Sequence, residues 1–242
     1  MQELHTADEL AEATDDLLVR WGGQALTTDD PARSGMAWRS SGAVAVHAPQ
    51  LNRRDRVLFT GSADDCADLL AEVLPELPGE RVRPLAPTAL AHQVAERLDL
   101  DVAATFGWMH LAAEPPRARP DAEWVADEQE VADLLRIANP TSWLVPGDPG
   151  AVRWAGVRDA SGRLLSVGAD SWPAPGIRFL AGVATAPEHR GTGLSTVVCS
   201  FLARELAREG AVTLMVDADN AAALKVYRRL GFSYQAVTAL RA

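Results

Sequence analysis

A glycine turn preceded by an arginine lies between an expected strand and an expected helix near the C-terminal end of the chain. The segment APEHRGTGLS, residues 186–195, follows a β-type run at 177–185. The first turn of a helix leaves N–H groups without acceptors and carries a partial positive charge, so it can bind a phosphate. Gly191 and Gly193 allow close approach to the backbone, and Arg190 adds a fixed positive charge. A pyrophosphate suits these groups, and further hydroxyl donors are Thr192, Ser195 and Thr196.

A second motif follows at residues 220–232, with the sequence NAAALKVYRRLGF. Asn220, Ala223 and Tyr227 are separated by three and then four residues, which places them on one face of a helix. Gly231 is a suitable left-handed terminator for this helix. Two alternatives stay open at this point, because many Gly-x-Gly turns bind no ligand and many helix tyrosines only pack their ring on the core.

The expected elements form an α/β fold with a mixed sheet and two domains. The proline-rich segment EPPRARPDAE, residues 114–123, resists regular structure, so we predict domains at 1–116 and 117–242. A strand–helix–strand crossover is expected at the C-terminal end, since apolar residues between 194 and 206 recur at helical spacing and 212–216 is almost wholly apolar. The patterns predict helices at 7–21, 63–73, 88–98 and 128–137, and strands at 36–39, 43–47, 57–60, 102–112, 152–158 and 164–170.

Composition excludes several classes of protein. The chain is 48% apolar and has a net charge of -10, which disfavours general binding to nucleic acid phosphates. No apolar run reaches the ~20 residues of a membrane span. The acidic N-terminal segment does not resemble a secretory signal, so a cytoplasmic location is expected. Cys66 and Cys199 lie far apart, without the spacing of a disulfide framework or a metal site.

The loop and the helix motif together resemble the GNAT superfamily of N-acetyltransferases, over about residues 152–237. The superfamily's pyrophosphate loop reads Arg/Gln-x-x-Gly-x-Gly/Ala, and this chain has Arg190, Gly193 and then Ser195, where glycine or alanine is usual. The chain is also similar to the branch that includes glycine N-acyltransferase relatives. The N-terminal half lacks both motifs, so it is expected to be an α/β domain, conceivably a degenerate GNAT repeat, that shapes the acceptor pocket or a dimer contact.

The resemblance implies a binding site for acetyl-CoA as co-substrate. The strand at Val183, Ala184 and Thr185 would pair with the pantetheine arm, and Asn220 would contact it. The Tyr227 hydroxyl would reach the coenzyme sulfur, where a phenol can protonate a departing thiolate, so Tyr227 is the candidate general acid. The N–H groups that would hold the pyrophosphate belong to Gly191, Thr192, Gly193, Leu194 and Ser195, and the implied coenzyme site also includes Arg190, Thr196 and Ala223.

The sequence does not specify which group is the general base or which molecule is the acceptor. Glu188, His189, Asp170 and Asp217 are candidate bases by position, although the first two are expected to be solvated and Asp217, with Asp219, can simply begin a helix. An ordered water is an equal alternative. The loop at 139–150 is expected near the acceptor, where Trp143 either forms a pocket wall or folds back onto the core.

The expected function is transfer of an acetyl or short acyl group from coenzyme A to a primary amine of a small molecule or peptide. No metal, nucleic acid or membrane partner is expected, and a homodimer is conceivable. A coenzyme-binding sensor without transfer activity is the alternative from another class. A scaffold that binds no coenzyme is a third alternative, which the presence of Arg190, both loop glycines and Tyr227 disfavours.

Overall fold

The computed structural model describes residues 1–78, 82–114 and 121–241. The chain divides into two compact units, residues 1–108 with 235–242 and residues 109–234. We call them unit 1 and unit 2. The strands β6 (Asp101–Leu111) and β12 (Phe232–Arg241) contribute residues to both units. The domain boundary predicted between residues 116 and 117 lies outside the described residues.

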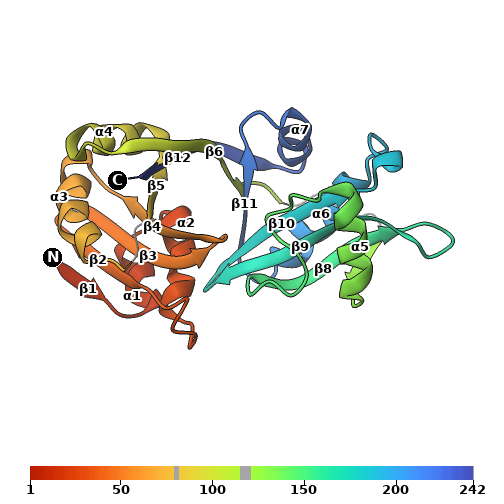
Figure 1. Ribbon diagram of the computed structural model, residues 1–242, viewed down its shortest axis with the longest axis horizontal. Helices are drawn as coiled ribbons and strands as arrows, with labels where there is room; N and C mark the ends of the chain where they lie inside the picture. Colours follow the sequence, from red (N-terminus) through yellow and green to blue (C-terminus); the bar gives the residue numbers. More distant parts are fainter. Residues whose placement is uncertain (79–81, 115–120, 242) are drawn as a thin grey trace. The chain divides into compact units, whose positions relative to one another are not determined.

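Unit 1 contains a mixed sheet with the strand order β1-β2-β3-β4-β5-β12-β6. β4 and β5 are parallel, whereas β1 to β4 follow one another as antiparallel neighbours. β12 runs antiparallel to β5, so the C-terminal end of the chain completes this unit (Figure 1). The remaining strands are β1 (Gln2–Leu4), β2 (Met36–Ser40), β3 (Ala43–Leu51), β4 (Arg54–Thr60) and β5 (Arg83–Pro87).

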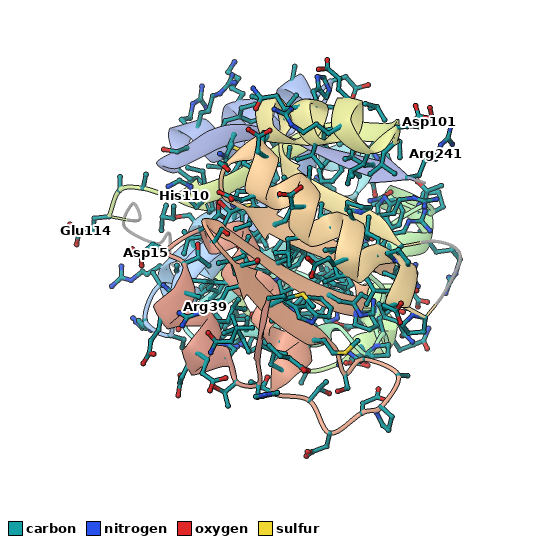
Figure 2. The ribbon with its side chains drawn as sticks, turned by 90° about the vertical axis from the view of Figure 1, so that its left-hand side faces the viewer. Asp15, Arg39, Asp101, His110, Glu114 and Arg241 are labelled. Carbon is teal, nitrogen blue, oxygen red and sulfur yellow. The ribbon has the colours of Figure 1, made fainter. Side chains whose placement is uncertain are left out.

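Contacts between side chains fasten β12 and β6 to this sheet. The Thr238 hydroxyl lies 3.0 Å from that of Thr88 and 2.8 Å from that of Thr105. Asp101, at the start of β6, pairs with Arg241, at the end of β12, at 3.5 Å (Figure 2). The last strand of the chain is therefore held in unit 1 by residues more than 130 positions away.

The helices of unit 1 correct one sequence prediction. The single helix predicted at 7–21 is wrong, because α1 (Ala7–Ala13) and α2 (Leu17–Trp21) are separate. Thr14 has extended backbone, and the Asp16 side chain accepts hydrogen bonds from the N–H groups of Leu18 and Val19 at 2.9 and 3.1 Å. This N-cap begins a new helix. The other helical segments are η1 (Gly22–Leu26), α3 (Ala63–Val73), η2 (Leu74–Glu76) and α4 (Thr88–Leu98).

Unit 2 contains five neighbouring strands in the order β11-β10-β9-β8-β7. β10 and β11 are parallel and are joined by α6, while β7 to β10 are successive antiparallel neighbours. The predicted crossover is thus confirmed (Figure 1). The elements are β7 (Ala122–Val125), α5 (Glu128–Ala138), β8 (Ala151–Arg158), β9 (Leu164–Ala174), β10 (Ile177–Thr185), η3 (Pro187–His189), α6 (Leu194–Leu206), β11 (Ala211–Asp217) and α7 (Ala221–Arg229).

The core of unit 2 is built around α6. Its apolar stripe packs with residues of β8, β10 and β11, and Leu202 and Leu206 are completely buried. Phe201 meets Trp124 edge to face, with ring centroids 5.1 Å apart. Full burial of one leucine side chain contributes roughly 1.5–3 kcal/mol, so this packing fixes the position of the helix, including its N-terminus.

The two halves of the chain, β1 to β6 and β7 to β12, repeat one order of elements. Each half has a strand, a helical segment, three antiparallel strands, a helix, a parallel strand, a helix and a last strand, and the last strand of the second half, β12, lies mostly in unit 1. They differ where the middle helix begins. In unit 1 only Gly61 and Ser62 separate β4 from α3, and the Ser62 hydroxyl accepts from the Asp65 N–H at 3.2 Å. The order supports a duplicated fold, and the short capped turn leaves no room between β4 and α3 for a loop like the one between β10 and α6.

Membrane-spanning helices and clusters of metal-ligating side chains are both absent from the described residues. No helix among them is both long enough and apolar enough to cross a membrane. No cluster of three or more His, Cys, Asp or Glu side chains among them is arranged to hold a metal ion.

Candidate functional site

β10 and β11 are paired over only the first part of β10. Ile177–Leu180 lies opposite Ala211–Leu214, and the register continues no further, although β10 extends to Thr185. The pairing of β10 with β9 shifts between Ala181 and Ala184. At the end of β10, Ala184 and Thr185 are paired with β9 alone and Val183 lies in the irregular stretch before them, so one edge of this backbone is available to an extended ligand.

Gly182 makes this irregularity possible. Its φ is +64°, and a Cβ atom there would lie 2.7 Å from the Trp154 ring. Any side chain would meet both a strained backbone and a buried indole. The sequence signal was available, since a glycine within a strand pattern often marks a bulge.

The loop between β10 and α6 presents a row of unused backbone donors. Gly193 is the N-cap of α6, and its carbonyl accepts hydrogen bonds from the N–H groups of Thr196 and Val197 at 3.0 and 3.2 Å. The N–H groups of residues 191–195 donate to no described residue. The first turn of α6 contains no acidic residue. The five N–H groups and the helix dipole can therefore hold an anion.

Both loop glycines have a left-handed backbone beside open space. The φ angles are +77° at Gly191 and +89° at Gly193, and a Cβ atom at either position meets nothing within 4 Å. The glycines are thus required for the course of the backbone rather than for internal packing. The Thr192 hydroxyl donates to the His189 carbonyl at 2.6 Å, so it stabilises the loop itself. Leu194, Ser195 and Thr196 are half-buried.

Arg190 has partners that the sequence did not indicate. Its Nη2 donates to the carbonyl of Ala138 at 2.8 Å, and its Nε donates to the carbonyl of Thr185 at 3.4 Å. Ala138 is the last residue of α5, where the helix dipole favours a cation. Arg190 therefore connects the loop between β10 and α6 to the segment that begins after α5, in addition to placing a positive charge near the loop.

The helix motif is present as α7, which begins after Asn220. The Asn220 side-chain oxygen accepts from the Ala223 N–H at 3.0 Å, so it caps the helix. Asn220 is exposed and Ala223 half-buried, and Tyr227 lies one turn further on in the core cluster of unit 2. The structure thus places the three residues on one helix. The side-chain oxygen of Asn220 already accepts a hydrogen bond from the helix backbone.

Tyr227 is held in an apolar environment. Its side chain is 7% exposed, and its ring lies 5.8 Å from that of Phe232 in an edge-on arrangement. The hydroxyl has no hydrogen-bond partner among the described residues. Burial, with a smaller contribution from the Cys199 thiol, raises the pKa of Tyr227 well above its usual range. The phenol therefore keeps its proton at neutral pH and can donate it.

The four candidate bases lie in different surroundings. Glu188 pairs with Arg163 at 2.6 Å, and its own backbone N–H together with Arg163 holds the pKa of this carboxyl below its ordinary value. His189 donates its backbone N–H to Ala186 at 2.9 Å, and Asp217 ends β11 in solvent. The structure brings none of these three into a hydrogen bond with Tyr227.

Asp170 belongs to a buried charge network. It is completely buried, and Arg153 and Arg178 approach its Oδ2 at 3.1 and 3.6 Å. Both arginines also pair with Glu209. Burial raises the pKa of Asp170, while the two arginines oppose the shift. These contacts give Asp170 a structural task that its position in the sequence did not reveal.

The loop at 139–150 keeps Trp143 on the surface. Trp143 is 52% exposed, whereas Leu144 is completely buried. The Ser142 hydroxyl donates to the Leu144 carbonyl at 2.7 Å, and the Val145 N–H donates to Asp148 at 2.8 Å. Leu144 thus anchors the loop in place of the tryptophan, and the alternative in which Trp143 folds onto the core is wrong.

The C-terminal segment of the chain is similar to known proteins. Residues 169–240 match the family model described as FR47-like protein. A mycothiol acetyltransferase of Tsukamurella paurometabola is 42% identical over 86 residues, which are 33% of this chain and 28% of that protein. The match therefore spans less than a third of that relative. The matched family segment contains the loop and the helix described above.

Solved structures share the fold of the whole chain. A GCN5-related N-acetyltransferase from Kribbella flavida has a TM-score of 0.62 at 17% identity and covers 94% of this chain and 96% of its own. A GNAT-family acetyltransferase from Colwellia psychrerythraea has a TM-score of 0.54 at 14% identity, with coverage of 100% and 99%. A tandem GNAT protein from the clavulanic acid biosynthesis pathway has a TM-score of 0.50 at 14% identity, with coverage of 98% and 97%. These similarities confirm the predicted mixed α/β fold, which the chain shares with these solved acetyltransferase structures.

Proposed function

Because the chain has the GNAT fold and an FR47-like C-terminal segment, we propose that unit 2 transfers an acetyl or short acyl group from coenzyme A to a primary amine of a small molecule or peptide. The observation that carries the proposal is the row of five unused N–H groups at residues 191–195, in the same unit as a buried, protonated tyrosine. The first feature suits a pyrophosphate, and the second suits a departing thiolate.

Each part of the site has a task in this reaction. The N–H groups of the loop bind the pyrophosphate, and the backbone at Val183, Ala184 and Thr185 pairs with the pantetheine arm. The thioester supplies the activated acyl group. Tyr227 donates its phenolic proton to the sulfur as the carbon–sulfur bond breaks, and the proton of the attacking amine passes to a base or to water.

The environment of Tyr227 favours the role of acid over that of base. A phenol with a raised pKa stays neutral at pH 7, so it donates a hydrogen bond to a developing thiolate and does not repel it. The apolar neighbours strengthen that hydrogen bond, since the effective dielectric constant is lower than in water.

Thiol release from acetyl-CoA, measured with a panel of amino acids, polyamines and peptides, tests the proposal. We expect turnover with at least one amine, and a loss of roughly 100-fold or more in kcat for Tyr227→Phe. Tyr234→Phe is the matched control, because Tyr234 is 37% exposed and is the other tyrosine of the chain. Coenzyme affinity, measured by calorimetry, should change less than about threefold in both variants, since the phenol acts on the departing sulfur.

Two results would contradict the proposal. Tight coenzyme binding without turnover on any amine would indicate a sensor, and absence of binding would indicate a scaffold. Equal activity in Tyr227→Phe and Tyr234→Phe would show that the Tyr227 hydroxyl takes no part in the reaction. It would not contradict coenzyme binding by the loop. A cytoplasmic location and a homodimer stay predictions.

A further inference from the structure

A buried arginine in unit 1 has no anionic partner among the described residues. Arg56, in β4, is 6% exposed. Its Nε donates to the Leu51 carbonyl at 3.3 Å, and its guanidinium carbon lies 5.7 Å from the centre of the Phe106 ring. No other hydrogen bond or ion pair joins it to the described part of the chain. A guanidinium has five N–H donors, so most of the donor capacity of Arg56 is unused.

Further positive charges lie close to this group. Arg83, in the parallel neighbour β5, is in direct register with Arg56, and its Nη1 donates to the Val82 carbonyl at 3.2 Å. Arg54 is two residues earlier on β4, so it projects from the same face of the strand. Burial, with added repulsion from Arg54 and Arg83, lowers the pKa of Arg56 to about 10. No carboxylate of the described residues pairs with Arg56 or Arg83.

Unit 2 shows how this chain compensates arginines beside a buried strand. Arg153 and Arg178 share two carboxylates, those of Asp170 and Glu209. A buried charge without such a partner is destabilising, and so are like charges directly opposite one another in a sheet. Unit 1 thus has a local excess of positive charge in a protein whose net charge is -10.

The terminal nitrogens of Arg56 can still be reached. The polar side-chain atoms of the described residues that are sealed from solvent and have no partner belong to His47, Trp154 and Asp170. The Arg56 nitrogens are not among them. They are therefore not completely sealed from solvent, and the planar fork of a guanidinium matches a carboxylate or phosphate group.

We propose that Arg56 and Arg83 form a binding site for a small oxyanion, a carboxylate or a phosphate group, with the Phe106 ring beside it. The site is separate from the loop that would bind pyrophosphate in a second GNAT repeat. Arg56 and Arg83 lie where the parallel pairing of β4 and β5 begins, whereas the turn into α3 follows Thr60, at the other end of β4. This inference does not depend on acyl transfer by unit 2.

Thermal unfolding of the full chain in phosphate, succinate or chloride, at equal ionic strength and pH, tests the site. A ligand that binds only the folded state stabilises by RT ln(1 + [L]/Kd), so the Tm should rise saturably with phosphate, succinate or both, relative to chloride. Arg56→Met and Arg83→Met should lose this rise. Arg97→Met is the control that keeps it, because Arg97 is exposed and pairs with Asp64 at 2.7 Å.

The outcomes separate the ligand classes. A rise with phosphate alone indicates a phosphate site, and a rise with succinate alone indicates a carboxylate site. An equal Tm in all three salts, or a rise that survives in Arg56→Met, would overturn the proposal. If Arg56→Met does not fold, Arg56→Lys keeps the charge but loses the fork, and it should bind the anion at least about tenfold more weakly.

Discussion

Replacing Gly193 with alanine tests whether the loop before α6 holds a pyrophosphate. Gly193 has a φ of +89°, and an added Cβ atom meets nothing within 4 Å. The change therefore introduces no clash, and the cost is the left-handed backbone of a residue with a side chain, about 1–2 kcal/mol. Gly162 is a matched control, because its φ is +88° and its surroundings are equally open. Both variants should lower the Tm by roughly 2–8 °C.

Only Gly193→Ala should weaken coenzyme binding. If the alanine keeps the left-handed backbone, its Cβ atom occupies the space beside the loop where the ligand would lie. If it relaxes to a negative φ, the N–H groups on either side turn away. A hydrogen bond to a charged group is worth about 1.5–3 kcal/mol, so the loss of one such bond weakens binding about 10- to 100-fold.

Calorimetry of coenzyme A binding to the parent, Gly193→Ala and Gly162→Ala measures this difference. Activity with acetyl-pantetheine, which has no pyrophosphate, provides a second readout and should be equal in the two variants. Coenzyme affinity that agrees within about threefold between Gly193→Ala and Gly162→Ala would refute pyrophosphate binding by the loop. The left-handed backbone destabilises both variants equally, so it cannot cause a difference between them.

Further predictions concern Arg190, Cys199 and Tyr227. Arg190→Met removes the bond to the Ala138 carbonyl, so we expect a loss of about 1–2 kcal/mol in unfolding free energy and a larger rise in acceptor KM than in coenzyme Kd. A selective rise in coenzyme Kd would instead place the guanidinium on the pyrophosphate. Burial raises the pKa of the Cys199 thiol to about 12 from 9.0, so its contribution to stability is present below pH 9 and declines as pH rises toward 12. Cys199→Ala removes this decline, and the stability gap between parent and variant should shrink by roughly 1 kcal/mol between pH 7 and pH 10 in urea unfolding. Tyr227→Phe should change the unfolding free energy at pH 7 by less than about 1 kcal/mol, since the hydroxyl has no partner among the described residues; circular dichroism during urea unfolding would reveal a larger loss.

Local patterns predicted most elements of this fold. The bounds of α3 and α4 agree with the apolar spacing that indicated them, and β10 occupies the predicted range 177–185. The break between α1 and α2 also had a local signal, because Asp16 is a good N-cap, but the prediction of one acidic helix from 7 to 21 did not use it. In these segments the decisive interactions join residues within about four positions of one another.

Local sequence patterns specify the strand, the glycine turn and the helix around the loop before α6, and also the helix that carries Asn220, Ala223 and Tyr227. Helix periodicity, caps and left-handed glycines are local properties, so they can be read along the chain. Tertiary packing, by contrast, brings Arg190 to Ala138, 52 positions away, raises the pKa of Tyr227 by burial, and sets Arg56 opposite Arg83 without a carboxylate among the described residues. These properties depend on burial and on charges from distant strands, and no local pattern specifies which side chains will exclude water from a given group.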